Sequence, residues 1–174
     1  KTLDQAYEIQ EHGLRLMGEE LGGWKVAMIL PDLRVGLKSE RLAGPILRRA
    51  LHDAQAGQAV TAKVYENGFA ALEAEFCVVV GEDLPKDPEA CTMDAVKAAV
   101  RSMHAGVEIA SSPLTILNDL GPLGLVSDFG GNAGGIIGPE IAGWREKPLE
   151  AMLTRTSING AIIGEGSAAK VPGG

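Results

Sequence analysis

The spacing of apolar residues predicts an amphipathic helix at the start of the chain. The tetrapeptide Thr2-Leu3-Asp4-Gln5 has the form of a capping box, which begins a helix by satisfying its first free amide groups. Gly22-Gly23 can supply a left-handed stop, so the predicted helix covers about residues 3–21. The positions that would form its buried face recur three to four residues apart: Leu3, Ala6, Tyr7, Leu14, Met17 and Leu21.

Short apolar runs after this helix predict strands. Trp24–Leu30 is one such run, Val60–Tyr65 alternates as a strand does, and Ala71–Val80 follows the turn dipeptide Asn67-Gly68. Between the first two runs, Pro31–Gly44 reads as a loop with room for a helical turn after Ser39.

The second half of the chain has one more helical pattern and several strands. A helix is predicted from Thr92, and Gly106–Ala110 is the next strand. The glycine-rich stretch Gly121–Gly138 is expected to form a long loop, and Met152–Ile163 with Asn159-Gly160 at its centre predicts a hairpin. Scattered short strands with two helices indicate an α+β or mostly β domain without alternating βαβ units.

Length and composition narrow the class of protein. A chain of 174 residues with 45% hydrophobic and 22% charged residues fits one globular domain. A net charge of −7 with only 4% aromatic residues and no basic stripe argues against nucleic-acid binding. No apolar run is long enough for a membrane helix. Two cysteines without a motif fit a reducing compartment, so we expect a cytoplasmic protein, although the start at Lys1 leaves a lost targeting segment open.

The chemistry begins with two glutamates in the predicted strand Ala71–Val80. Alternation places Glu73 and Glu75 on one face, about 6.6 Å apart at roughly 3.3 Å per residue. In a dry setting such a pair must share a proton, find Lys or Arg, or hold a cation. A strand end that emerges into water would instead leave both carboxylates solvated, and this stretch alone favours the solvated alternative.

Two further charged residues lie in short apolar strands. Glu108 sits between the small residues Gly106 and Ala110, and together with Glu73 and Glu75 it could close an all-oxygen site for Mg²⁺ or Mn²⁺. This spacing alone is a weak signal. Lys25 lies in Trp-Lys-Val-Ala, where its ammonium would face inward beside an acid or snorkel to the surface, and composition favours the surface alternative.

Five sequence blocks in one order resemble the hydratase/decarboxylase branch of the fumarylacetoacetate hydrolase superfamily, typified by 2-keto-4-pentenoate hydratase and 4-oxalocrotonate decarboxylase. The resemblance covers nearly the whole chain, and the order of the blocks is more specific than any one of them. The blocks are GGWKVA at 22–27, ALEAEFCVVVGEDLP at 71–85, GVEIASS at 106–112, SDFGGNAGGIIG at 127–138 and SINGAIIGEGSAA at 157–169.

The resemblance implies a fold and a set of site residues. The expected fold is a mixed β-sandwich or β-roll with peripheral helices, forming a single catalytic domain over 1–174 whose β-rich core covers about residues 24–174. By position, Glu73, Glu75 and Glu108 match the family's ligands for one Mg²⁺ or Mn²⁺, and Lys25 matches its active-site lysine. Substrate-binding residues are expected in the block at 127–138, namely Asp128 and Asn132.

The sequence also departs from the family pattern. Ala27 stands where many relatives have Gly, and Gly131 where many have Asp. The sequence stops in mid-pattern at its C-terminal end, so we expect a chain that lacks part of the fold, with poor stability or self-association on its own. The partners expected from the resemblance are a small 2-oxo acid, further copies of the chain in a homo-oligomer, and a partner pathway enzyme.

The implied activity is that of a metal-dependent lyase in the breakdown of aromatic compounds. The first candidate reaction is hydration of a 2-hydroxypenta-2,4-dienoate-type substrate to a 4-hydroxy-2-oxo acid. It ranks first because the hydrolase branch usually brings a Glu–His pair, which has no clear counterpart here. The alternatives are a 4-oxalocrotonate-type decarboxylase, an acylpyruvate C–C hydrolase and a non-catalytic partner subunit. Lys25 is expected to act on the substrate, since an ammonium cannot ligate a cation and a nearby cation disfavours its charged form.

Overall fold

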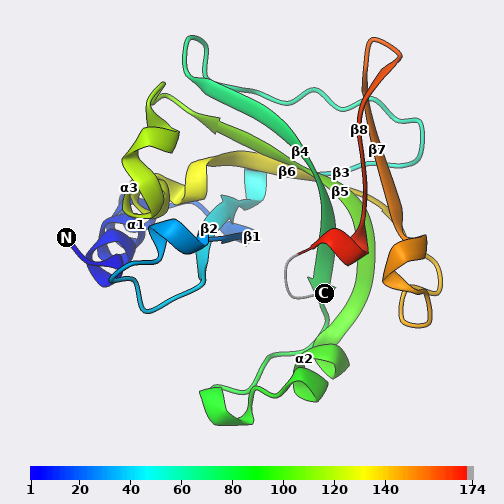
Figure 1. Ribbon diagram of the computed structural model, residues 1–174, viewed down its shortest axis with the longest axis horizontal. Coiled ribbons are helices and arrows are strands. Elements are labelled where there is room, and N and C mark those ends of the chain that lie inside the picture. Colours follow the sequence, from blue (N-terminus) through cyan, green and yellow to red (C-terminus); the bar gives the residue numbers. More distant parts are fainter. Residues whose placement is uncertain (172–174) are drawn as a thin grey trace. The chain divides into compact units, whose positions relative to one another are not determined.

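A computed structural model of the chain describes residues 1–171. Its strands form three sheets, with short helices between the strands along the chain (Figure 1). The strands form a two-stranded sheet β1-β2, a four-stranded sheet in the order β3-β6-β5-β4, and a two-stranded sheet β7-β8. The helices are α1 Leu3–Met17, α2 Met93–Ala99 and α3 Gly121–Ser127; the strands are β1 Leu21–Met28, β2 Arg41–Leu47, β3 Leu51–Asp53, β4 Phe69–Val80, β5 Val100–Ser112, β6 Asn132–Glu140, β7 Leu153–Ile158 and β8 Ala161–Ser167.

The fold class agrees with the α+β prediction. The chain divides into two compact units, the first being residues 1–53, 58–73 and 108–136 and the second residues 54–57, 74–107 and 137–174. The division passes through β4, β5 and β6, each of which continues unbroken from one unit into the other. A β-sandwich or β-roll and a single catalytic domain stay predictions.

The first helix begins where the sequence predicts and ends earlier. Thr2 and Gln5 form the capping box, with the Gln5 amide donating to Thr2 Oγ1 over 3.2 Å. The helix ends at Met17 because Gly18 adopts the left-handed conformation, with φ 61°, and donates to the Leu14 carbonyl. The predicted end at about residue 21 was therefore wrong, and Gly22-Gly23 lie within β1 instead.

Three other segments differ from the predicted pattern. Residues 58–65 form no strand, and β2 begins within the predicted loop, at Arg41. The glycine-rich stretch 121–138 folds into α3, a helical turn over Phe129–Gly131 and most of β6, since its glycines permit close packing that a propensity argument scores as loop. The second helix ends at Ala99, and β5 begins at the next residue, Val100, earlier than the predicted strand at 106–110.

The hairpin and the strand containing the glutamates are as predicted. Asn159 and Gly160 both have positive φ, 51° and 83°, as a two-residue hairpin turn requires. Strand β7 pairs antiparallel with β8 through this turn, with Ile158 opposite Ala161. Strand β4 contains the whole predicted strand Ala71–Val80.

The core of the first unit packs α1 and α3 against the β1-β2 pair. Its buried apolar residues are Ala6, Ile29, Leu42 and Val126. Buried Gln10 on α1 ties the layers together, because its amide donates to the Ala43 carbonyl over 3.1 Å and to the Val126 carbonyl over 2.8 Å. These bonds fix β2, the partner strand of β1, relative to both helices.

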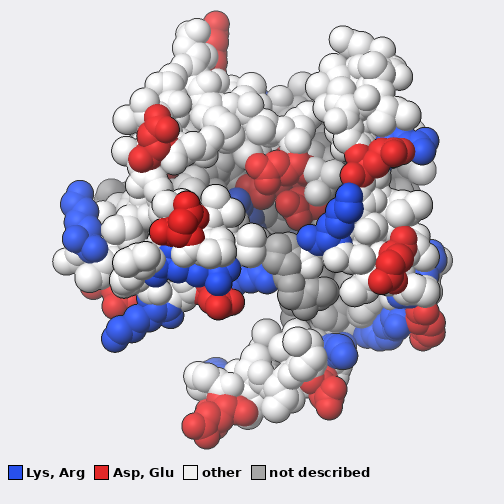
Figure 2. All heavy atoms as spheres, viewed as in Figure 1, with Lys and Arg blue, Asp and Glu red and all other residues white. Residues whose placement is uncertain are grey.

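Charge is distributed over the surface in both signs. Figure 2 shows acidic and basic side chains interspersed on the face that it draws. Among residues 1–171, no helix has the length and apolar content needed to cross a membrane.

Close approach of the backbone makes Gly44 on β2 a sensitive position. A Cβ there would collide with the Phe129 carbonyl and lie 2.8 Å from Gly130 Cα. We expect Gly44→Ala to lower the free energy of unfolding by about 1–3 kcal/mol, the usual cost of forcing atoms into a packed site. The measurement is chemical denaturation followed by circular dichroism.

Gly23→Ala is the matched control, because Gly23 lies on β1, the strand paired with β2. A Cβ at Gly23 would lie 3.7 Å from Leu51 Cδ1, which is an ordinary van der Waals contact. Equal stability of the two variants would contradict the close approach between β2 and the Phe129–Gly130 turn.

Candidate metal centre

Three glutamate side chains converge at β4 and β5. Glu73, Glu75 and Glu108 each offer one carboxylate oxygen, and these oxygens all lie within 4.8 Å of one another. Glu73 and Glu75 are two residues apart on the continuous strand β4, and Glu108 comes from β5, its neighbour in the sheet order. The structure thus brings together the three carboxylates that the sequence singled out.

The carboxylates differ in exposure, and the two on β4 agree with the solvated alternative. Glu108 is buried, with 7% of its surface exposed, whereas Glu73 and Glu75 are exposed. Strand β4 lies at the end of the sheet order, and most of its residues are exposed. One side of the strand has no partner strand among the described residues, which leaves its side chains open to water.

Lys25 is paired with the buried member of this set. Its Nζ lies 3.2 Å from Glu108 Oε1, and the two side chains are 12% and 8% exposed. The surface-lysine alternative is therefore wrong for Lys25. Removing two charges from water is costly, and the short distance between opposite charges offsets part of that cost.

Glycines on two segments make room for the Lys25 side chain. Lys25 sits opposite Gly44 in the β1-β2 register. A Cβ on Gly130, whose φ is 74°, would lie 3.0 Å from Lys25 Cδ. The sequence block that supplies Gly130 therefore shapes the path of the lysine stem toward Glu108.

The donor set fits a hard divalent cation. Two ligands of one ion can be no farther apart than twice the metal–oxygen distance, which is about 4.2 Å for Mg²⁺ and about 4.6–5.2 Å for Ca²⁺. An upper limit of 4.8 Å between the carboxylate oxygens falls within the Ca²⁺ range and needs only small side-chain movements for Mg²⁺. One ammonium balances one of three formal negative charges, so a cation would remove the remaining repulsion.

Cys77 lies two residues after Glu75 on β4, and burial and the negative charge of Glu75 both affect its pKa. The pKa of its thiol is raised above the ordinary value, first by burial and second by the negative charge of Glu75. Both effects disfavour the thiolate. Cys77 and Cys91 form no disulfide, and both are half-buried.

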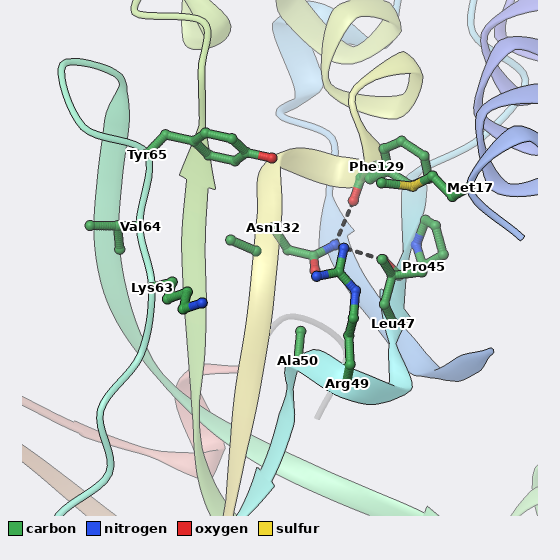
Figure 3. A pocket seen from close by; sticks show the side chains of 11 residues that line it. Met17, Pro45, Leu47, Arg49, Ala50, Lys63, Val64, Tyr65, Phe129 and Asn132 are labelled. Atoms are coloured by element: carbon green, nitrogen blue, oxygen red, sulfur yellow. Dashed lines mark hydrogen bonds between the residues drawn. The ribbon is translucent and has the colours of Figure 1, made fainter. Parts of the chain in front are cut away.

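The two predicted substrate-binding residues lie at either side of the Phe129–Gly131 turn. Asn132 begins β6, and its amide donates to the Phe129 carbonyl over 2.5 Å and to the Pro45 carbonyl over 3.1 Å. Asn132 also lines a cavity of about 360 Å³ in the first unit (Figure 3). Asp128 is half-buried at the end of α3 and is not among the residues lining that cavity. Substrate contact by either residue stays a prediction.

Sequence reasoning missed several residues that shape this part of the molecule. Gly44 and Gly130 carry no chemical signal, and only their close contacts reveal their role. Arg49 and Lys63 line the cavity but belong to no motif. His104 donates from Nδ1 to the Gly138 carbonyl, and its Nε2 is hydrogen-bonded to Ser102 Oγ, both over 2.9 Å.

Comparisons with known proteins identify the fold. No protein-family model matches the sequence, and no curated protein matches it. Among solved structures, two of the 4-oxalocrotonate decarboxylase from Pseudomonas putida G7 are similar, each with a TM-score of 0.67 and 19% sequence identity. One of them is complexed with calcium and acetate and the other with magnesium and adipate.

The likeness extends over 97% of this chain and over 62% and 63% of the two solved chains. This chain therefore spans less than two thirds of the length of those proteins. At 19% identity the comparison shows a shared fold, and it agrees with the fold implied by the sequence blocks at the level of α+β architecture.

The thiol of Cys77 allows a direct test of the Glu75 position. In a Cys91→Ser background without metal, we expect Cys77 to be alkylated by iodoacetamide only at higher pH than an ordinary cysteine, because its thiol pKa is raised. Glu75→Gln removes one of the two causes and should move the pH–rate profile to lower pH.

Glu82→Gln, just beyond the end of β4, serves as the control and should leave the profile in place. A profile that Glu75→Gln does not move would mean that the Glu75 carboxylate does not share the face of Cys77.

Proposed function

We propose that this chain carries the divalent-cation site of a lyase that acts on small unsaturated 2-oxo acids. The observation that supports this most is the convergence of Glu73, Glu75 and Glu108 with Lys25 beside Glu108. The five sequence blocks and the shared fold with a decarboxylase point in the same direction. Carboxylate oxygens are the ligands that Mg²⁺, Mn²⁺ and Ca²⁺ prefer.

The roles of the residues follow from their chemistry. Glu73, Glu75 and Glu108 would hold the cation, which when bound supplies Lewis-acid stabilisation to the enolate form of a 2-oxo acid. Lys25 would bind the substrate carboxylate or transfer a proton, since its ammonium is held close to the carboxylate cluster. Asp128 and Asn132 are proposed to contact the substrate, and Asn132 in addition holds the turn before β6 in place.

Two overall reactions would use the same electron acceptor, the C2 oxygen of the 2-oxo acid. In hydration, a dienol first becomes an unsaturated 2-oxo acid; the oxygen of water then bonds to the far carbon, and a proton goes to the carbon next to it. In decarboxylation, the bond to a carboxylate breaks, carbon dioxide leaves, and its electron pair moves onto the C2 oxygen until a proton is added at carbon. Hydration stays the first candidate because the Glu–His pair of the hydrolase branch has no clear counterpart in the sequence, and the solved structures of similar fold support decarboxylation as the second candidate.

A screen of substrates separates these reactions and a non-catalytic role. It would use dienols, oxalocrotonate-like acids and acylpyruvates with Mg²⁺ and Mn²⁺, on this chain and on any longer natural protein that contains it. Release of carbon dioxide identifies a decarboxylase, whereas a 4-hydroxy-2-oxo acid without gas release identifies a hydratase. Cleavage to two acids identifies a hydrolase, and metal binding without any turnover would identify a partner subunit.

If the three glutamates hold a cation, a variant that removes one of their charges should bind it more weakly. Glu75→Gln removes one charge and keeps the shape, so we expect Mg²⁺ or Mn²⁺ to bind about tenfold or more weakly, because affinity follows ligand charge. Isothermal titration calorimetry measures the change.

Glu40→Gln is the matched control, since Glu40 is exposed and pairs with Arg34 away from the cluster. Unchanged affinity in the Gln variants of all three cluster glutamates would show that the site is assigned wrongly.

Lys25 is expected to act in the reaction. In an active form of the protein, Lys25→Met should lower kcat by about 10²–10⁴, the usual effect of losing a general acid or base. A rise in KM alone would instead make Lys25 an anchor for the substrate carboxylate. Full activity would show that Lys25 has no chemical role.

The ion pair with Glu108 requires a stability control for this variant. A buried carboxylate that loses its partner is costly, by about 3 kcal/mol here, so Lys25→Met lowers stability as well as removing the ammonium. We expect a lower melting temperature in chelator and a larger recovery with Mg²⁺ than in the unaltered chain. Lys38→Met, at a lysine away from the cluster, should show neither effect.

A further inference from the structure

The turn that precedes β6 has an unusual backbone. Phe129, Gly130 and Gly131 follow one another with φ angles of 54°, 74° and 73°, all in the left-handed region. Glycine adopts this region readily, whereas a residue with a Cβ is held there against its own preference. Phe129 is therefore the member of the turn that opposes the conformation of the turn, and surrounding contacts must hold it in place.

The ring of Phe129 is held by helix α1. A Cβ added at Gly13 would lie 3.0 Å from Phe129 Cζ and 3.4 Å from Phe129 Cε2, so the end of the ring lies directly against the helix backbone. Met17, one turn further along α1, lies beside the ring, and both residues line the same cavity (Figure 3). A glycine inside a helix lowers its stability, and here its small size makes room for an aromatic side chain.

The carbonyl of Phe129 is held from two other sides. The Asn132 amide donates to it over 2.5 Å, and a Cβ at Gly44 on β2 would collide with it. The same amide donates to the Pro45 carbonyl over 3.1 Å, which ties the turn to β2. Ring and carbonyl are thus fixed by separate elements, and these contacts offset the cost of the left-handed conformation.

Gly130, the next residue of the turn, forms part of the wall around Lys25. A Cβ on Gly130 would lie 2.9 Å from Gly44 Cα and 3.0 Å from Lys25 Cδ. At its end the lysine is only 12% exposed, with Nζ 3.2 Å from Glu108 Oε1. A rotation of the backbone at Phe129 would move Gly130, because the two residues share a peptide unit. The lysine stem would then lose the surface that it lies against.

We propose that Phe129 is a positioning residue for Lys25: its ring, seated at Gly13, holds the turn in the conformation that keeps the lysine stem directed toward Glu108. This role explains why a phenylalanine stands where the backbone favours glycine. A glycine would adopt the turn but would leave it without a contact to α1. The inference concerns the placement of Lys25 and requires no turnover, so it can fail while the proposed lyase function holds, and the reverse.

The test measures how fast an N-hydroxysuccinimide ester acylates Lys25 in EDTA, by mass spectrometry of peptides, with exposed Lys38 as the internal reference. Gly13→Ala pushes against the end of the ring. We expect it to raise the Lys25 rate relative to Lys38 about fivefold or more, because displacing a packed segment exposes the groups that it covers. Alanine favours a helix more than glycine does, so a weaker α1 would not be the cause.

A second substitution should reverse this effect. Phe129→Leu removes Cζ and Cε2, the ring atoms nearest to Gly13. The double variant Gly13→Ala with Phe129→Leu should therefore return the Lys25 rate toward that of the unaltered chain, whereas two independent structural defects would add. His12→Ala, at the exposed neighbour of Gly13 on α1, is the matched control and should leave the rate unchanged.

Two variants without the ring separate the backbone from the side chain. Asparagine tolerates the left-handed region, and β-branched valine opposes it. Phe129→Val should therefore raise the Lys25 rate more than Phe129→Asn does. Circular dichroism confirms that each labelled chain is folded; if Phe129→Val does not fold, Gly13→Ala and its reversal decide alone.

Two results would overturn the inference. One is an unchanged Lys25 rate in the folded Gly13→Ala chain. The other is a rise in Gly13→Ala that Phe129→Leu does not reverse, which would mean that the added methyl group acts on Lys25 by a route other than the Phe129 ring.

Discussion

The ion pair between Lys25 and Glu108 is the interaction on which the candidate site depends. It places an ammonium from β1 against the one buried carboxylate of the cluster, at 3.2 Å. The pair needs the β1-β2 register, which puts Lys25 opposite Gly44, and it needs the Phe129–Gly130 turn, which has no side chain where the lysine stem passes. The core formed by α1, α3 and β2 holds these segments together, with Gln10 bonded to the carbonyls of Ala43 and Val126.

The pair also leaves two of the three carboxylate charges in the cluster without a balancing cation among the residues of the cluster. Lys25 balances one carboxylate, and Glu73 and Glu75 bring two more into the same few ångströms. Strands at sheet edges often carry charges, and exposed glutamates tolerate repulsion by moving apart in water. Glu108 has less freedom because it is buried. A divalent cation would satisfy all three oxygens together, and a neighbouring substrate carboxylate could then meet Lys25.

Local sequence patterns predicted some parts of the structure well. The capping box at Thr2, the hairpin at Asn159-Gly160 and the strand containing Glu73 and Glu75 depend on neighbouring residues alone, and all three are present. The end of α1 was misplaced because Gly18 offers the left-handed stop before Gly22 does. The 121–138 segment was misread as loop because its glycines combine positive φ with close packing, as at Gly130 and Gly131, inside a segment that is otherwise helix and strand.

For the candidate site, the residue types identified the three carboxylates, but spacing could not show that they converge. The side chains come from two strands, and their approach depends on strand pairing that no short-range pattern specifies. The exposure of Glu73 and Glu75 agrees with the solvated alternative, whereas the burial of Lys25 was misjudged, since it depends on what covers the strand. Arg49 and Lys63 had no sequence signal, because they come to line one cavity only in the folded unit.

The central claim is that Glu73, Glu75 and Glu108 hold one divalent cation. Anomalous X-ray scattering from crystals grown with Mn²⁺ tests it most directly, because it locates the ion without any assumption about activity. The account predicts a single strong anomalous peak at about 2.0–2.6 Å from an oxygen of each of the three carboxylates, the range of oxygen–cation distances for such ions. A peak bound by other residues, or ordered carboxylates with no peak between them at millimolar Mn²⁺, would contradict it.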